Sequence, residues 1–213
     1  MPVAAGVTTS AVRPRGRAVV AWVVGVVAAW GIVAGLHLFG LRLANLWLFG
    51  LVITGLGWLV ALTVTGVALG VLWRRVGPVR AMALVLVPGL LAPVAIVAVN
   101  WTSVYVHNFY RLNRDDFRAA AALADKVTAG YGDRYGQVLP KNLRHLSSMG
   151  RAVRIGTEGS GPEGVLLPVW LGTPDGAAGY AYLDGTPGDA SFDCFADPCR
   201  MRWSLGDGWY WLD

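Results

Sequence analysis

The first 114 residues of this 213-residue chain contain no aspartate and no glutamate. All 13 acidic residues lie from Asp115 onward, where they outnumber nine basic residues. Nine arginines before Asp115 have no acidic counterpart, so the net charge of +5 originates in the front half of the chain. A basic balance of this origin does not indicate a nucleic-acid-binding surface on a soluble domain, and we expect no nucleic-acid partner.

Motifs that fix a reaction are also missing. There is no calcium-binding loop of the form D-x-[DN]-x-[DN]-G and no G-x-S-x-G nucleophile elbow. Ser147 and Ser148 lie near His145, but without the elbow they do not predict a hydrolase. Six aspartates lie in predicted turns, where Asp is a favoured residue: Asp175, Asp184, Asp189, Asp193, Asp197 and Asp207. We therefore expect a non-enzymatic protein without a cofactor or a metal ion.

Three long stretches of the front half carry no Asp, Glu, Lys or Arg. They run over Ala18–Leu41, Leu43–Trp73 and Ala81–Tyr110, and contain 24, 31 and 30 residues. A helix needs about 20 mostly apolar residues to cross a bilayer core of about 30 Å. The sequence thus predicts a three-span transmembrane bundle with helices at about 18–39, 46–73 and 81–104. A disordered basic tail, residues 1–17, precedes it.

The distribution of arginine predicts how these spans are oriented. Six arginines lie in the N-terminal tail and in the connection between spans two and three, whereas the first connection carries only Arg42. Short Arg-rich segments remain in the cytoplasm, which favours a cytoplasmic N-terminus and a C-terminal domain outside. Three further arginines just past span three change the count to six against four, which still favours the same orientation. Arginine outnumbers lysine 16 to 2, a bias typical of high-GC bacteria, so we predict a bacterial cell membrane.

The two cysteines, Cys194 and Cys199, lie close together in the predicted outer domain. Outside the cytoplasm such a pair favours a structural disulfide, which would fix a turn around Asp197-Pro198. Free thiols and a metal site are the alternatives. A zinc site needs four ligands, and nothing in the spacing supplies the other two.

Glycines recur at a spacing of four within two of the spans. Gly31 and Gly35 in the first span, and Gly66 and Gly70 in the second, would let two helix backbones approach closely. This pattern predicts helix packing, either among the three spans of one chain or between copies of the chain. Pro88 and Pro93 predict a bend in the third span.

Residues 105–213 are predicted to form a small α+β domain with an antiparallel sheet. A helix is expected over Arg114–Ala129, with Asn113 as its N-cap, and a shorter helical turn around Lys141–Ser148. Alternating apolar residues separated by turn sequences predict five strands. These are Ala152–Ile155, Gly164–Leu171, Ala178–Leu183, Arg200–Leu205 and Trp209–Leu212.

Aromatic residues are concentrated at the C-terminal end of the chain, as Trp203, Trp209, Tyr210 and Trp211. Strand alternation would place Trp209 and Trp211 on one face and Tyr210 on the other. These side chains either form the core of the domain or provide an exposed aromatic surface for a partner.

The sequence thus favours a membrane protein that presents a small extracytoplasmic domain for partner recognition or for support of a cell-envelope complex. Its expected partners are the lipid bilayer and either another protein or further copies of itself. An accessory subunit of a transport or channel assembly is the alternative, and an envelope enzyme is the third. The spans contain no ionisable residue except His37, which gives little support to a transport pathway.

Overall fold

The computed structural model describes residues 15–127, 136–156, 163–171, 176–186, 188–194 and 197–213. The predicted tail lies outside these ranges except for residues 15–17. The chain forms two compact units, which are described separately. The first comprises residues 1–36 and 53–99, and the second comprises residues 37–52 and 100–213.

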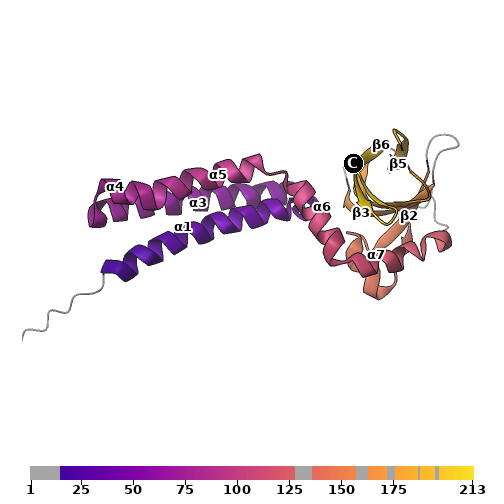
Figure 1. Cartoon of the computed structure of the whole chain (residues 1–213), viewed down its shortest axis with the longest axis horizontal. Coiled ribbons are helices and arrows are strands. Elements are labelled where there is room, and N and C mark those ends of the chain that lie inside the picture. The colour runs from indigo at the N-terminus through magenta and orange to yellow at the C-terminus, as the bar shows by residue number, and fades with distance from the viewer. Residues whose placement is uncertain (1–14, 128–135, 157–162, 172–175, 187, 195–196) are drawn as a thin grey trace, which may run out of the picture. The chain divides into compact units, whose positions relative to one another are not determined.

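Three long helices make up the first unit (Figure 1). They are α1 (Arg15–Leu38), α3 (Leu48–Val76) and a third helix built in three consecutive parts. These parts are α4 (Pro78–Ala81), the π-helical turn η1 (Met82–Leu86) and α5 (Val87–Ala98). All three helices are long and apolar enough to cross a membrane, over 23, 29 and 21 residues.

The helices touch one another through a few close contacts. The indole Nε1 of Trp30 in α1 donates a hydrogen bond to Thr65 Oγ1 in α3 at 3.1 Å. Gly57 faces α1, where an added Cβ would lie 2.6 Å from Leu36 Cδ1. Gly89 faces α3 in the same way, at 2.7 Å from Thr65 Cγ2. A larger side chain at Gly57 or Gly89 would therefore have to displace a side chain of the neighbouring helix.

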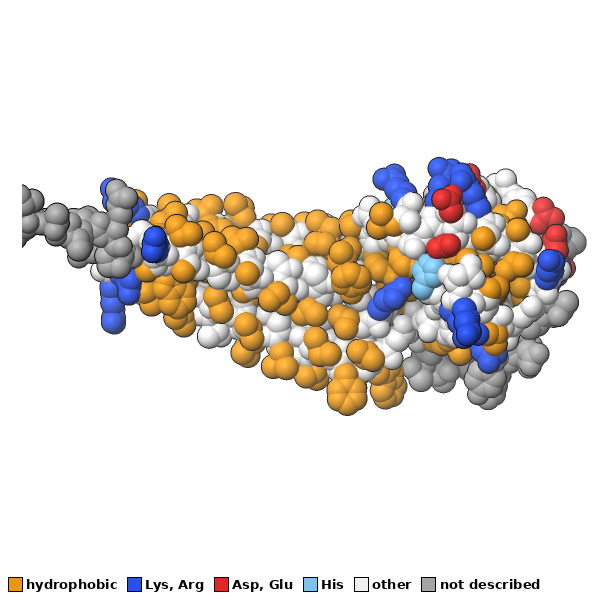
Figure 2. Space-filling model, turned by 90° about the horizontal axis from the view of Figure 1, so that it is seen from below, with side chains coloured by type: hydrophobic (Ala, Val, Ile, Leu, Met, Phe, Trp, Pro, Cys, Tyr) orange, Lys and Arg blue, Asp and Glu red, His pale blue; other side chains and the backbone are white. Residues whose placement is uncertain are grey.

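Most side chains of these helices point away from the unit. Exposed apolar residues occur along all three helices, and Val97 in α5 is 75% exposed. Figure 2 shows hydrophobic side chains spread over the helical unit on the face in view. In water such a surface is unfavourable, whereas hydrocarbon solvates it without cost.

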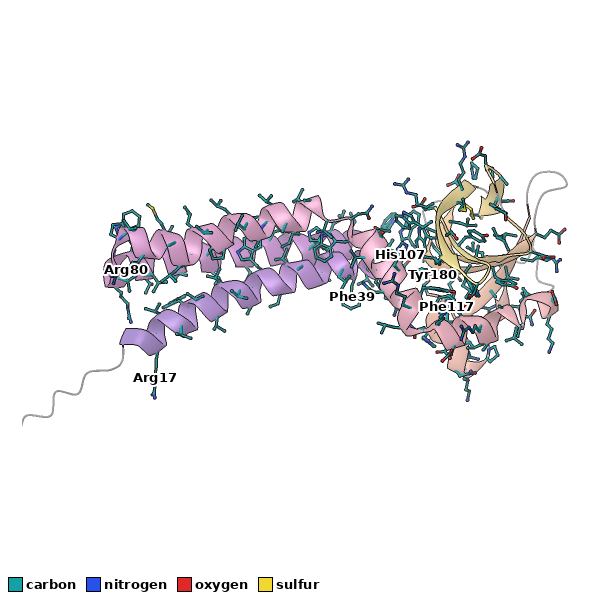
Figure 3. The ribbon with its side chains drawn as sticks, in the orientation of Figure 1. Arg17, Phe39, Arg80, His107, Phe117 and Tyr180 are labelled. Carbon is teal, nitrogen blue, oxygen red and sulfur yellow. A yellow bond between two sulfur atoms is a disulfide. The ribbon has the colours of Figure 1, made fainter. Side chains whose placement is uncertain are left out.

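Arginines gather at one end of this unit because its helices are antiparallel. Figure 3 shows Arg17, near the start of α1, at the same end as Arg80 in α4. Arg74 and Arg75 lie in the last turn of α3, directly before this end.

Pro88 explains the π-helical turn before α5. Proline has no backbone N–H, and its ring clashes with the carbonyl four residues earlier. The helical turn takes up one extra residue at this point, so that the Val87 N–H donates to the Met82 carbonyl, five residues earlier. The helix then continues through Pro93 to Ala98. It ends six residues before the predicted end of the third span.

The second unit contains one curved antiparallel sheet of seven strands in the order β1-β2-β3-β4-β7-β6-β5. The strands are β1 (Gln137–Val138), β2 (Arg151–Ile155), β3 (Gly164–Leu171), β4 (Ala177–Leu183), β5 (Ser191–Cys194), β6 (Asp197–Gly206) and β7 (Trp209–Leu212). The sheet curls until β5 approaches β2, where the Asp193 N–H lies 3.4 Å from the Gly156 carbonyl. All five predicted strands are present, whereas β1 and β5 were not predicted.

Two apolar clusters cover opposite faces of the sheet. One cluster contains Phe117, Tyr180, Trp209 and Trp211 and packs against the helices. The other, inside the curl, contains Phe192, Leu212 and both cysteines. In β6 a register shift follows Met201, so Met201 faces the second cluster whereas Trp203 faces the first. A β-bulge of this kind changes the face that a side chain occupies.

Helical segments of the second unit are α2 (Gly40–Ala44), α6 (Trp101–Leu112), α7 (Arg114–Ala121) and the 3₁₀ turns η2 (Ala124–Lys126) and η3 (Lys141–Leu146). Asn100 begins α6, because its Oδ1 accepts from the Ser103 N–H at 3.0 Å. Asn113 precedes α7 as predicted, but its side chain does not cap that helix. Its Nδ2 donates instead to the Phe109 carbonyl in α6, at 2.8 Å.

Candidate functional site

The connection between the first two long helices is part of the sheet domain's compact unit. Arg42, its only charged residue, makes three contacts there. Its Nε donates to Tyr105 Oη at 2.7 Å, and its Nη2 donates to the His145 carbonyl at 3.3 Å. The guanidinium carbon also lies 5.3 Å from the centre of the Phe109 ring, a cation–π distance.

Asn45 extends this attachment to the sheet. Its Nδ2 donates to the Val169 carbonyl at 2.9 Å, and its Oδ1 accepts from the Leu171 N–H at 3.3 Å. The side-chain amide thus satisfies a donor and an acceptor of β3, next to the bulge between Pro168 and Trp170. We call Arg42, Asn45 and the groups they bind the clamp.

The clamp was not predicted from the sequence. Arg42 was counted only as a topology signal, yet its guanidinium is engaged by the domain. Its partners Tyr105 and His145 are 63 and 103 positions away in the chain. No local pattern relates residues so far apart, and a lone arginine and asparagine in an apolar connection were the available signals.

A second polar group of the domain joins η3 to α7. His145 Nε2 lies 3.3 Å from Asp116 Oδ2 and 3.2 Å from Asn113 Oδ1. The hydroxyls of Ser147 and Ser148 each donate to the Pro168 carbonyl at 3.1 Å instead of approaching His145. The serines therefore satisfy the backbone at the bulge in β3, which is a structural use of both hydroxyls.

The tight turn between β6 and β7 is fixed to α6 and α7. Arg114 donates from Nε and Nη2 to the two carboxylate oxygens of Asp207, at 3.0 and 3.1 Å. Arg118 adds a longer ion pair at 3.5 Å, and Tyr110 Oη donates to the Gly206 carbonyl at 3.0 Å. Hydrogen bonds from Arg114 lower the pKa of Asp207. The pKa of Tyr110 is raised, mainly by burial of its hydroxyl and to a smaller extent by the negative charge of Asp207.

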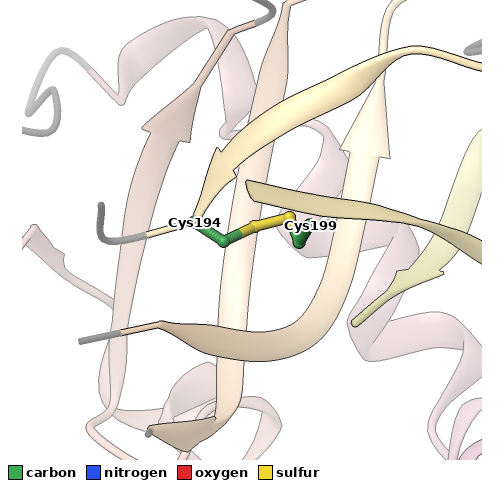
Figure 4. The surroundings of a disulfide bond; sticks show 2 residues. All are labelled: Cys194 and Cys199. Carbon is green, nitrogen blue, oxygen red and sulfur yellow. A yellow bond between two sulfur atoms is a disulfide. The ribbon is translucent and has the colours of Figure 1, made fainter. Parts of the chain in front are cut away.

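Cys194 and Cys199 form a disulfide across the β5–β6 hairpin (Figure 4). Their Cα atoms are 5.7 Å apart, and both residues are buried in the cluster inside the curl. The predicted disulfide is therefore present, and the free-thiol and metal alternatives do not apply to these residues. Asp197 and Pro198 do not form the turn, because they pair with Cys194 and Asp193 as the first residues of β6.

The C-terminal aromatic residues divide between the core and the surface. Trp209 and Trp211 have exposed fractions of 1% and 0%, which agrees with the core alternative, whereas Trp203 and Tyr210 are half-buried. Trp203 has two polar neighbours: the Arg202 guanidinium carbon and the centre of the His107 ring each lie 5.8 Å from its ring centre. Of the four, Trp203 and Tyr210 keep surface that a partner could reach.

The indole N–H groups of Trp209 and Trp211 are buried and, among the described residues, lack a hydrogen-bond acceptor. Each indole instead meets an aromatic ring almost perpendicularly. Trp209 lies 4.9 Å from Phe117, and Trp211 lies 5.1 Å from Tyr180. Edge-to-face contacts of this kind offset part of the missing hydrogen bond.

The predicted helix-packing glycines are not where the helices of this chain meet. An added Cβ at Gly31, Gly35, Gly66 or Gly70 would find no atom within 4 Å. An added Cβ at Gly57 or Gly89 would instead meet a side chain of a neighbouring helix. A role of the four glycines in contacts between chains stays a prediction.

In the ranges that the structure describes, no three His, Cys, Asp or Glu side chains gather in a way that could hold a metal ion. Two cavities of the domain lie on either side of η2. Asp125, Arg154, Glu163 and Asp184 line one, and Lys126 and Arg144 line the other.

Comparisons of the chain with protein-family models, curated proteins and solved structures found no match.

Proposed function

We propose that this protein is a non-enzymatic integral membrane protein that presents its sheet domain outside the cytoplasm for recognition of a partner or support of an envelope complex. The observation that carries the proposal is the pairing of three long helices with outward apolar side chains and a folded, disulfide-bonded domain. Lipid accounts for the exposed apolar surface, and an oxidising compartment accounts for the disulfide.

Charge supports the proposed orientation. Arg17, Arg74, Arg75 and Arg80 lie at one end of the helical unit, which would face the cytoplasm of a bacterial cell. Arg42, the only charge of the first connection, is engaged by the domain, so it does not compete with this signal.

Two variants, each with one cysteine added to the native pair, test the orientation, because the paired cysteines do not react with maleimides. Val79→Cys places a thiol in the Arg-rich connection, where Val79 is 79% exposed, and Ser204→Cys places one on the exposed side of β6. In intact cells, a membrane-impermeant maleimide should label S204C, and should label V79C only after permeabilisation. The reverse pattern would overturn the proposed topology.

Partner recognition is tested at Trp203, the aromatic side chain that lies beside Arg202 and His107 and keeps exposed surface. Crosslinking in the native membrane should give a partner adduct that Trp203→Ala removes and that Ser204→Ala, its neighbour in β6, retains. Equal adducts in both variants would remove this surface from the proposal.

An assembly subunit is the second candidate. The open faces at Gly31, Gly35, Gly66 and Gly70 favour it, since they leave room for another helix to approach. Replacing Gly66 and Gly70 with leucine should break a complex that depends on these faces. A complex unchanged in size on native gels would exclude this role.

A further inference from the structure

One cavity of the sheet domain combines an apolar interior with positive charge. It has a volume of about 340 Å³ and lies among η2, β1, η3 and β2. Its apolar lining is formed by Leu123, Val127, Val138, Leu139, Pro140 and Ala152. Val127, Leu139 and Ala152 belong to the core cluster, so the floor of the cavity is fixed by the packing of the domain. The volume is at the low end of the range for small-molecule sites.

The charged residues that the structure describes in this lining, Lys126 and Arg144, are both basic. Arg144 is held by a hydrogen bond from its Nε to the Leu139 carbonyl at 3.1 Å, and its aliphatic stem packs beside Gly150. Within the described ranges, no carboxylate forms an ion pair with Lys126 or Arg144. Both side chains are exposed, so an anionic group at the edge of the cavity can reach them.

The neighbouring cavity shows that this charge is local. It has a similar volume, about 330 Å³, but Asp125, Glu163 and Asp184 line it together with Arg154. There the Arg154 Nη2 is already paired with Glu163 at 2.6 Å. From Asp115 onward the chain is more acidic than basic, so it is distinctive that the described residues of this lining include two cations and no acid.

We infer that the Lys126/Arg144 cavity binds a single-chain amphiphile with a carboxylate head, such as a medium-chain fatty acid. The apolar walls would receive the acyl chain, and the two cations would hold the carboxylate. The small volume favours one chain over the two chains of a phospholipid. The inference does not depend on the proposed orientation or on Trp203.

A photoreactive decanoate with a diazirine on its chain tests the inference on the full chain in nanodiscs of zwitterionic lipid. Mass spectrometry should place the adduct in peptides that contain residues 123–127 or 137–144. The matching decanol probe has the same chain without the charge, so it should label this site far less. Equal labelling by the alcohol, or adducts confined to the long helices, would overturn the inference.

Charge-removing variants sharpen the test. Lys126→Gln and Arg144→Gln should each weaken decanoate binding about tenfold, the value of one charge-assisted hydrogen bond. Arg154→Gln, in the acidic cavity, is the matched control and should leave binding unchanged. Because Arg144 also donates to the Leu139 carbonyl, the folding of R144Q should be checked by a thermal denaturation measurement. If R144Q does not fold, the test rests on K126Q alone.

Competition tests whether the bound carboxylate belongs to a fatty acid or to the C-terminus of a peptide. Unlabelled decanoate should displace the probe at lower concentration than an apolar peptide with a free C-terminal carboxylate. A peptide that competes better than decanoate would overturn the fatty-acid assignment.

Discussion

The two units of this chain use apolar residues in opposite ways. The helical unit turns most of them outward and packs its helices through a smaller buried set, which includes Val33, Leu72 and Val85. The sheet domain buries them, with Phe117, Tyr180 and Trp211 at the centre of a connected aromatic cluster. Folding of the domain can thus be driven by burial of apolar surface from water, whereas the outward apolar side chains of the helical unit are not buried within this chain.

The largest expected effect comes from removing the centre of the aromatic cluster. Phe117 is fully buried and contacts the rings of Phe109, Tyr110, Tyr180 and Trp209. Phe117→Ala should lower the free energy of unfolding of the domain by about 4 kcal/mol through lost contacts and a cavity. Thermal denaturation followed by near-UV circular dichroism measures this loss.

Val97→Ala in α5 is the comparison, because its exposed side chain loses no packing within the chain. It should leave the domain transition unchanged. If both variants lowered stability equally, the contrast between a buried core and an outward apolar surface would be wrong.

Removing the disulfide should have a smaller effect on the domain. Cys194 and Cys199 close a short loop, so Cys194→Ala with Cys199→Ala should cost about 2 kcal/mol through the entropy of the unfolded chain. Alanine is preferred to serine because both positions are buried in the apolar cluster. Urea denaturation with and without reductant measures the loss of stability. Reductant should lower the free energy of unfolding of the native protein and leave that of the double variant unchanged.

How far the sequence predicted this structure depends on whether a pattern is local. Alternation located β2, β3, β4, β6 and β7 to within three residues at each end, because each strand carries its own signal. Strands β1 and β5 have two and four residues, too few for alternation to stand out. The helix expected over Arg114–Ala129 stops at Ala121, and the end of the expected range lies outside the described residues.

The candidate site was predicted less well than the fold. The disulfide followed from the proximity of two cysteines in the chain. The burial of Trp209 and Trp211 was one of two alternatives, since composition does not say which side of a strand faces the core. The clamp joins Asn45 to Val169, 124 positions apart, and such pairs emerge only when the sheet and the connection are both in place.

Loss of the clamp, which lies within the sheet domain's compact unit, should cost less than loss of the disulfide. Arg42→Ala removes the hydrogen bonds to Tyr105 and His145 and should cost about 1 kcal/mol. Hydrogen exchange should accelerate over residues 40–45, while the core strands of the domain keep their protection. Arg111→Ala, at an exposed position of α6, is the matched control.

A double-mutant cycle with Tyr105→Phe isolates the Arg42–Tyr105 hydrogen bond. Additive effects of the two substitutions would show that the connection is not held by this bond. Unchanged exchange over residues 40–45 in R42A would likewise contradict the clamp.

The smallest effect is expected from pH at the turn between β6 and β7. Arg114 lowers the pKa of Asp207, so the folded state favours the ionised carboxylate. The stability from this pair is present above the ordinary pKa of aspartate, about 4, and is lost as the pH falls from there through the lowered pKa. Asp207→Asn should flatten this acid limb of a plot of melting temperature against pH. Asp115→Asn is the control because its side chain, next to Arg118, is 96% exposed. An acid limb that D115N flattens as much as D207N would show that the Arg114–Asp207 pair adds no pH dependence of its own.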